Sequence, residues 1–533
     1  MKSTRSAAIP TTRAGACLAV LLPALALAGP PAEDARPAPQ IGVAGIRAAE
    51  GGDSRDDWIP LAIEEMLTWR LRRVPGTRVI PTARLHQARQ ELGDAAGDAA
   101  PWPKALAALG GRTLVSGVCA GPPEAVTLEL VLIDARAESA AYATTKIEPR
   151  RLFDALDEAT RWLLVRLGVS SLDSAVERRI FAPPSDSVTA LEYYAKALRA
   201  GRARDLDEAR YFAREAVDYD AMLRPAQLVL SRMEARGDPS QRLRAAARLR
   251  RLAELARGAG DEHTRGEVEI EEGVLSLIGG QHDAAITRLA AALRRLEAVG
   301  DVYGDLTAMN YLCDAHLTRT PPPGETLSSE QSAAFARANL ERGREWMRGV
   351  LAKLVELDDR ISQPAAAHKL AQICEGLGDV AGAGQAYEQM LASARAAGSR
   401  KGESAASLLL GSWQRRQGKL SEAITAFRAG LALADDSARP AAEMALGETL
   451  REAQQQAEAL AHFQAAQRAL ETGDDLQSQL VCLRNIADLR MSLGQRREAI
   501  EALQLALDIA HVLELADAQE LAATLSKWKS GGP

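Results

Sequence analysis

The sequence predicts an α-helical solenoid of stacked helix pairs, preceded by a small mixed α/β domain. After about residue 187, a pattern of small residues, a turn glycine, an alanine and a large apolar residue recurs at fixed spacing. Aromatic residues make up only 4% of a chain in which alanine and leucine dominate the second half, a composition that favours packed helices. Short strand-like runs alternate with helical ones between residues 40 and 170.

The spacing in the second half repeats in both distance and residue size. A small residue is followed seven positions later by a turn residue, then after five, four and three further positions by alanine, a large apolar residue and, in most copies, a second small residue. Three copies of this pattern are Gly273, Gly280, Ala285, Leu289 and Ala292; Gly411, Gly418, Ala423, Phe427 and Gly430; and Ala487, Gly494, Ala499, Leu503 and Ala506. Two more are Ala371, Gly378, Ala383, Tyr387 and Met390; and Gly447, Gln454, Ala459, Phe463 and Ala466.

This pattern resembles the tetratricopeptide repeat. Small side chains let the two helices of a pair approach closely, and a glycine at the turn suits the conformation that ends the first helix. A single pair cannot bury its apolar face alone, so neighbouring pairs must stack. We therefore expect about eight pairs over 187–510, an irregular stretch at 303–354 and a capping helix over 511–529. Phe427, Phe463, Trp413 and Tyr387 are expected in the core.

The region 40–170 is expected to have the element order β-α-β-α-α-β-β-β-α. Strands are predicted at 41–46, 77–80, 113–119, 126–133 and 141–147. Helices are predicted at 58–74, 83–92, 103–109 and 152–167. In the fourth strand apolar and polar residues alternate, as in a strand with one buried face.

This α/β region resembles the N-terminal domain of TolB and of related CadC-like periplasmic sensor proteins. The resemblance covers roughly 130 residues and is carried by the opening strand 41–46, Trp58 with Leu61, Val79-Ile80-Pro81, and the runs 109–118 and 130–134. It implies a docking module. A spacer without a partner remains the alternative. Nothing downstream repeats as short strands, so the β-propeller of TolB is not expected.

The first 39 residues have the layout of a secretory signal peptide and a linker. Lys2, Arg5 and Arg13 precede an apolar run over 14–28 that ends in Ala26-Leu27-Ala28, a signal for cleavage before Gly29. We expect a signal peptide at 1–28, linkers at 29–39 and 171–186, and a periplasmic or secreted protein with no integral membrane span after cleavage. An uncleaved anchor is the alternative.

The sequence argues against several classes of function. With a net charge of -6 and no basic stripe, a nucleic-acid partner is not expected. The five cysteines form no CxxC or Cys/His cluster, so no metal site is expected. The chain has no HExxH, GxSxG or Walker A motif, and its seven histidines are scattered. We expect no enzyme and no cofactor.

The expected partner is a protein or peptide held on the concave face that the first helices of such an array line. The candidate contacts are the residues beside the small consensus positions: His368, Gln372, Ser412, Arg415, Arg416, Met444, Glu448, Arg451, Arg484 and Asp488. For each, a simple solvated position is the alternative. The function predicted is an exported interaction scaffold or adaptor. The alternative is a sensory component of an envelope signalling system that lacks a DNA-binding domain of its own.

Overall fold

The structure is a computed structural model that describes residues 40–49, 57–93, 100–135, 141–169, 172–181, 185–321, 327–471 and 473–531. The expected signal peptide (1–28) and linker (29–39) lie outside these residues, as do residues 322–324 of the proline-rich break. Among the described helices, none is both long enough and apolar enough to cross a bilayer.

The α/β region has the element order that the sequence predicts. Its strands are β1 (Gln40–Ala48), β2 (Arg78–Ile80), β3 (Thr113–Ala120), β4 (Val126–Asp134) and β5 (Ala141–Arg150). Its helices are α1 (Ile59–Leu71), α2 (Thr82–Glu91), α3 (Trp102–Ala108) and α4 (Leu152–Arg166). The predicted ends agree to within a few residues.

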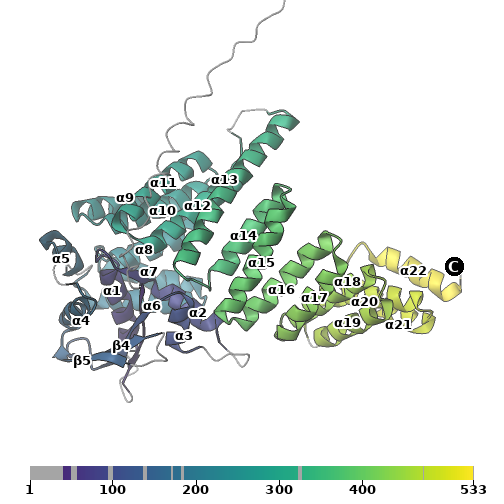
Figure 1. Ribbon diagram of the computed structural model, residues 1–533, viewed down its shortest axis with the longest axis horizontal. Coiled ribbons are helices and arrows are strands. Elements are labelled where there is room, and N and C mark those ends of the chain that lie inside the picture. Colours follow the sequence, from purple (N-terminus) through teal and green to yellow (C-terminus); the bar gives the residue numbers. More distant parts are fainter. Residues whose placement is uncertain are drawn as a thin grey trace, which may run out of the picture. The chain divides into compact units, whose positions relative to one another are not determined.

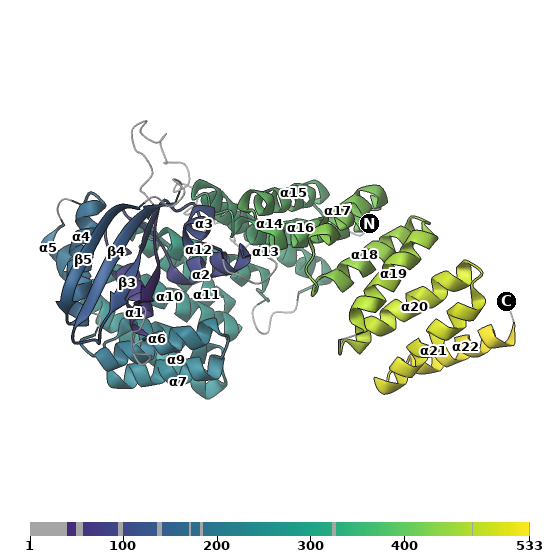
Figure 2. The ribbon, with the colours of Figure 1, turned by 90° about the horizontal axis from the view of Figure 1, so that it is seen from below.

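The five strands form one mixed sheet in the order β2-β1-β3-β4-β5 (Figure 2). β1 runs parallel to both β2 and β3, while β3, β4 and β5 are antiparallel. α1 and α4 pack on one face, in a core with Val43, Val115 and Leu130, and α2 and α3 pack on the other. In β4, Leu128 and Leu130 are fully buried, which confirms the predicted alternation.

Eight helix pairs follow in the described part of the chain, coloured from teal to yellow in Figure 1. The fold class is therefore the predicted helical solenoid behind a small α/β domain. The first four pairs are α6 (Val188–Arg202) with α7 (Leu206–Tyr219), α8 (Arg224–Ala235) with α9 (Pro239–Gly258), α10 (Glu262–Ile278) with α11 (His282–Val299), and α12 (Val302–Leu317) with α13 (Ser329–Glu356). The others are α14 (Gln363–Gly376) with α15 (Val380–Ala397), α16 (Arg400–Arg416) with α17 (Leu420–Leu433), α18 (Arg439–Glu452) with α19 (Gln456–Leu470), and α20 (Leu476–Ser492) with α21 (Arg496–Val512).

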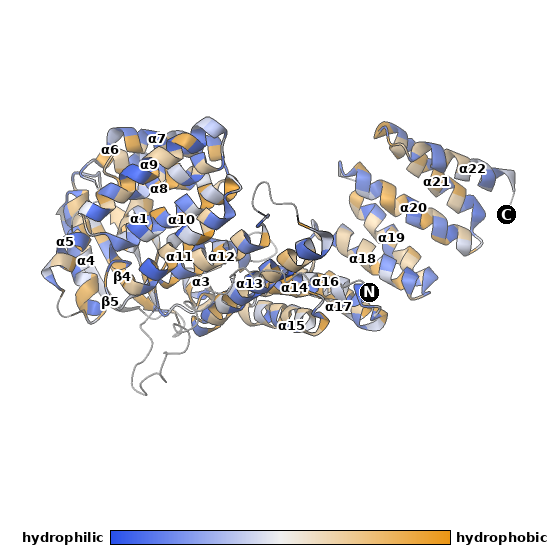
Figure 3. Ribbon diagram, turned by 90° about the horizontal axis from the view of Figure 1, so that it is seen from above, coloured by the Kyte–Doolittle hydropathy of each residue, from blue (hydrophilic) through white to orange (hydrophobic). Residues whose placement is uncertain are grey.

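Two boundaries differ from the sequence prediction. The expected linker 171–186 contains a helix, α5 (Ser174–Phe181), whose Ile180 is buried against Val74 and Leu164. The capping helix begins later than expected. α21 continues to Val512, and the final helix α22 spans Ala518–Ser530. Figure 3 shows apolar and polar residues mixed along the helices. The sequence pattern therefore does not define the exact ends of these helices.

The turn inside each pair explains the recurring glycine. Gly418 ends α16 with a φ of 72°, in the left-handed region that glycine enters without steric cost. In the pair α18–α19 the same position is Gln454, which adopts a φ of 61°. The turn geometry is thus kept even where the sequence departs from glycine.

A large side chain packs against a small residue inside each regular pair. A Cβ atom added at Gly447 would lie 3.0 Å from the Phe463 ring, and one at Gly411 would lie 3.2 Å from the Phe427 ring. Both rings are essentially fully buried. Trp413 and Tyr387 are buried too, so the sequence-based assignment of these four aromatics to the core is confirmed.

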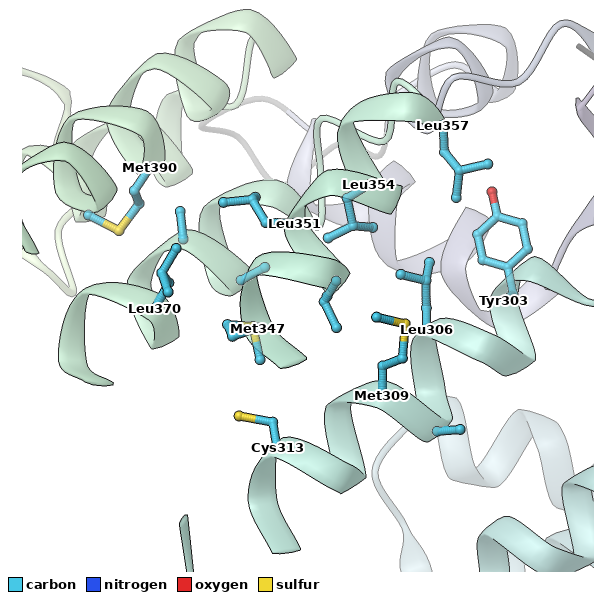
Figure 4. Close-up of a cluster of buried hydrophobic side chains, with 14 of the residues drawn as sticks. Tyr303, Leu306, Met309, Cys313, Met347, Leu351, Leu354, Leu357, Leu370 and Met390 are labelled. Atoms are coloured by element: carbon cyan, nitrogen blue, oxygen red, sulfur yellow. The ribbon is translucent and has the colours of Figure 1, made fainter. Parts of the chain in front are cut away.

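The pair α12–α13 is irregular, as predicted. α13 has 28 residues, against 14 to 18 in the helices of the following pairs. The first ten residues of α13 are mostly exposed, and its buried side chains come mainly from its second half, as Figure 4 shows. Met347, Leu351 and Leu354 of α13 point into one apolar cluster with Met309 of α12 and Leu370 of α14. The cluster keeps the array continuous across the break.

The described cysteines behave as small hydrophobic residues. Cys119, Cys313, Cys374 and Cys482 are all buried and free. Burial raises the pKa of Cys313 to about 11 and that of Cys119 to about 12, so both stay protonated at neutral pH. Among the described residues, no group of metal-ligating side chains is close enough to hold an ion.

The α/β domain is joined to the array by largely buried ion pairs that the sequence did not predict. Arg72, which follows α1, donates to Glu267 at 3.1 Å and to Asp301 at 2.7 Å. Arg73 donates to Asp261 at 3.0 Å. Asp261 and Asp301 are the N-caps of α10 and α12. One oxygen of each carboxylate caps its helix, and the other accepts the arginine.

Charge pairing controls the protonation of both aspartates. Burial alone would raise the pKa of Asp301, but Arg72 and His263 outweigh it and hold that pKa well below its usual range. Asp261 is likewise kept low by Arg73 and Arg224 against the effect of burial. Both carboxylates are therefore ionised at neutral pH.

A second set of contacts joins the start of β1 and nearby loops to α12 and the end of α13. The side-chain amide of Gln40 donates to the carbonyl of Leu357 at 2.7 Å, and the hydroxyl of Tyr303 donates to Gln40 at 3.0 Å. A Cβ atom at Gly110 would lie 1.8 Å from the Leu357 carbonyl oxygen, so only glycine allows this approach. Arg84 of α2 completes the set by donating to Asp359 at 2.5 Å.

α1 therefore lies against first helices of the N-terminal repeats. Glu65 of α1 accepts from Arg202 of α6 at 3.1 Å, and Tyr194 of α6 belongs to the same core as α1. Burial raises the pKa of Glu65 to about 7, with Glu64 adding to the effect and Arg202 opposing it. The carboxyl group is thus partly protonated near neutrality in the folded protein.

This raised pKa predicts a pH dependence of stability. Between about pH 4.5 and about pH 7 the folded state retains a proton on Glu65 that the unfolded chain loses, so the free energy of unfolding should fall as pH rises through this window. Glu65→Gln removes this titration. We expect its free energy of unfolding, measured in urea, to change less than that of wild type between about pH 5 and about pH 8.

Glu158→Gln serves as the control, since Glu158 is an exposed partner of Arg150. It should follow the wild-type profile. Parallel profiles for wild type and Glu65→Gln would contradict the assignment.

Candidate functional site

The residues predicted to bind a partner lie on four successive first helices. His368 and Gln372 are on α14, and Ser412, Arg415 and Arg416 are on α16. Met444, Glu448 and Arg451 are on α18, and Arg484 and Asp488 are on α20. We call the surface that these ten residues mark the first-helix face.

Half of these residues pair with a neighbouring helix instead of standing alone. Arg415 donates to Glu448 at 2.5 Å and to Glu452 at 2.9 Å, which ties α16 to α18. Arg416 donates to Glu375 of α14 at 2.6 Å. The contacts therefore extend from α16 in both directions along the array.

The same pattern continues toward the C-terminus. Arg451 donates to Asn485 of α20 at 2.6 Å, and Arg484 donates to Asp517, the N-cap of α22, at 3.2 Å. These five contacts span 33 to 41 residues, which is one repeat step. The first-helix face is therefore a ladder of polar contacts between consecutive repeats.

Glu448 apart, the sequence analysis missed the acceptors of this ladder. Glu375, Glu452, Asn485 and Asp517 lie on or at the start of first helices but were not among the candidates. A search for opposite charges one repeat apart would have found three of them. Asn485 carries no charge and would still have escaped.

The remaining candidates differ in exposure. Gln372 and Asp488 are exposed, while Ser412, Met444 and His368 are half-buried. Burial lowers the pKa of His368, whose ring lies 6.1 Å from that of Tyr387. Burial raises the pKa of Asp488, while Arg451 and Arg484 oppose the shift. The four polar side chains can still offer hydrogen bonds to a ligand, and Met444 can offer apolar contact.

The face is hollowed at its centre. A cavity of about 370 Å³ is bordered by Ser412, Arg415, Arg416 and Glu452. Its rim carries two guanidinium groups and one carboxylate, so it suits a polar main chain or mixed side chains better than an apolar body. Within the rim, the Ser412 hydroxyl donates to the Leu408 carbonyl and Glu452 accepts from Arg415.

Comparison with known proteins yields structural likenesses only. No protein-family profile matches the chain, and neither does any curated protein sequence. Solved structures similar to it include a STAND ATPase with a tetratricopeptide repeat sensor from Pyrococcus horikoshii, at 12% identity and a TM-score of 0.43, over 70% of this chain and 56% of that one.

RapI is similar at 10% identity and a TM-score of 0.41, over 64% of this chain and 99% of its own. The TPR2AB domain of yeast Sti1 in complex with pHSP90 is similar at 15% identity and a TM-score of 0.21, over 64% and 98%. At these scores the likenesses add no argument to the helix packing described above.

The ladder predicts weak coupling at each step. Arg415 and Glu448 are both about one-third exposed, and such pairs contribute about 0.2–1 kcal/mol. A double-mutant cycle with Arg415→Gln and Glu448→Gln, followed by urea unfolding, should give a coupling energy of about 1 kcal/mol or less.

The more buried pair Arg72–Asp301 serves as the comparison. Replacing one of its two residues should lower the free energy of unfolding by about 3–5 kcal/mol. If the Arg415–Glu448 coupling equalled that of Arg72–Asp301, the first-helix face would be a structural seam and not a surface free for a ligand.

Proposed function

We propose that this protein is a non-catalytic interaction scaffold whose first-helix face, over α14 to α20, binds another polypeptide. The proposal rests on a contrast within one array. In the N-terminal repeats, α1 of the protein's own α/β domain lies against the first helices α6 and α10. In the C-terminal repeats, the corresponding helices leave Gln372, Arg416, Arg451 and Asp488 exposed.

The N-terminal repeats, which hold the α/β domain, indicate how a partner would be held. Arg72 and Arg73, at the end of α1, place guanidinium groups on acidic side chains of the successive first helices α10 and α12. The first-helix face offers arginines and carboxylates at one-repeat intervals, which suits an extended or helical segment of mixed charge. A ligand would exchange its own ion pairs for those of the ladder, at little cost because those pairs are exposed.

Site-specific photocrosslinking of the full chain tests this proposal. A photoreactive residue at Gln372 or Asp488 should capture the same discrete polypeptide in cells, since both lie on the first-helix face. The matched controls are Gln385 on α15 and Asp508 on α21, which are exposed on second helices. We expect no adduct from either control.

Two results would overturn the proposal. One is the absence of any adduct at Gln372 and Asp488. The other is equal capture by first-helix and second-helix positions, which would indicate non-specific contact.

We further propose that the scaffold works outside the cytoplasm, in the periplasm or as a secreted protein. The support is the cationic leader, the apolar run and the Ala26-Leu27-Ala28 site at its end. The protein recovered from a bacterial host should begin at Gly29, by N-terminal mass analysis, and should fractionate with periplasmic markers.

Deletion of residues 14–28 is the control and should leave the chain in the cytoplasm. Recovery of the full chain with an intact Met1 in the cytoplasmic fraction would show that the leader is not an export signal.

A further inference from the structure

A second candidate site lies in the α/β domain, away from the first-helix face. A cavity of about 680 Å³ opens at the carboxyl ends of β1 and β3. Its walls come from α1, α2, α3 and β4, and Arg202 of α6 closes one side. Cavities of this size commonly hold small molecules.

The topology of the sheet places this cavity where ligands usually bind. From β1 the chain passes through α1 to β2 on one side, and from β3 it turns to β4 on the other side. The carboxyl ends of β1 and β3 therefore form a switch point of the strand order. In open α/β sheets a crevice at such a point is the preferred ligand site.

A bulge in β1 directs a charged side chain into the cavity. The pairing of β1 with β3 shifts by one residue between Val43 and Ile46, and Gly45 adopts a φ of 75° there. The shift turns Ile46 into the core beside α1. Arg47, paired with Val118, is thereby turned to the face that carries α2, and both residues line the cavity.

Buried groups hold this arrangement in place. Glu64 is 4% exposed, and its Oε1 accepts from the Ile46 amide at 2.9 Å. Its Oε2 lies 3.6 Å from Nε2 of His86, too far for a hydrogen bond. Trp102 fills the space beside Gly45, where an added Cβ would lie 2.5 Å from the ring. Contacts with Glu64 of α1 and with Trp102 of α3 therefore stabilise the bulge.

The charges at the cavity favour an anion. Three arginines line it against two carboxylates, Asp57 and Glu64. Asp57 and Arg202 each pair with a residue outside the cavity. Arg47 is exposed and has no ionic partner among the described residues. Arg89 uses its Nε for the carbonyl of Ala100, and its guanidinium centre lies 4.6 Å from the centroid of the Trp102 ring.

The rest of the lining is apolar. Leu61, Val131 and Ile133 contribute to the walls next to Trp102. The charged groups thus lie near the end of β1, and the apolar side chains of β4 form the wall beside them. A planar guanidinium is suited to the paired oxygens of a carboxylate or a phosphate.

We propose that this cavity binds a small organic anion, with its carboxylate or phosphate group on Arg47 and Arg89 and its apolar or aromatic body against Trp102 and Val131. This inference is independent of the scaffold function and survives if that function fails. Because Arg202 of α6 borders the cavity, the ligand would contact both the α/β domain and the first repeat.

Calorimetric titration of the full chain with phenylacetate and phenyl phosphate tests the proposal, and uncharged phenylacetamide is the reference probe. At least one anion should bind with a stoichiometry of one, and phenylacetamide should bind more weakly. Arg47→Gln should weaken the binding about ten-fold or more, because it removes a charge-assisted contact. Arg47→Lys should retain more affinity for phenyl phosphate than for phenylacetate, because it keeps the charge and loses the planar fork.

The matched control is Arg112→Gln, an exposed arginine at the opposite end of β3. It should leave the affinity unchanged. Arg47 has no described partner, so its replacement should not unfold the protein, and circular dichroism checks this. Absence of saturable binding of both anions up to about 10 mM, equal binding of phenylacetamide, or an equal loss with Arg112→Gln would overturn the proposal.

Discussion

This architecture depends on two aspartates of the array. Each one caps the start of a helix and also binds an arginine of the α/β domain. Asp261 and Asp301 each give one oxygen to the first turn of a helix and the other to Arg73 or Arg72. The arginines thereby fix the position of α1 against α10 and α12. Because the carboxylates are buried and ionised, loss of either arginine would leave a charge without compensation.

This constraint divides one array into two halves with different surroundings. The repeats up to α13 pack against the α/β domain and share a core with it, as Ala105, Leu114 and Leu306 illustrate. That shared core extends to Trp413 of α16, whereas the buried residues from α17 onward form a separate core. Among the described residues, the α/β domain touches α14 and α16 only at their starts, through Ser362 and Ser399, and Gln372 and Arg416 farther along these helices stay exposed.

The fold was largely predictable from sequence because its rules are local and periodic. The spacing of Gly411, Gly418 and Phe427 encodes a close helix contact, a left-handed turn and the side chain that fills the gap. The alternation in β4 encodes one buried face in the same way. Gln454 shows the limit of reading residue types alone, since its position in the period predicts its conformation better than its identity does.

The docking of the domains and the pairing along the first-helix face were not predictable in the same way. Arg72 and Asp301 lie 229 residues apart, and no period relates them. The sequence does contain a trace of the interface, because Arg72 and Arg73 stand side by side directly after the helix α1. The candidate residues of the first-helix face were placed on the expected helices. Their ion pairs needed coordinates, because side-chain reach across a repeat step depends on superhelical geometry.

The wide sequence separation of the docking contacts also affects how the chain is built. The bond from Gln40 to Leu357 joins residues 317 positions apart, whereas the repeats from α18 onward pair mainly within about one repeat step. Native pairing of the α/β domain therefore has to wait until more than half of the polypeptide has emerged, and its arginines stay hydrated until then. The C-terminal repeats can instead form one after another as they are made.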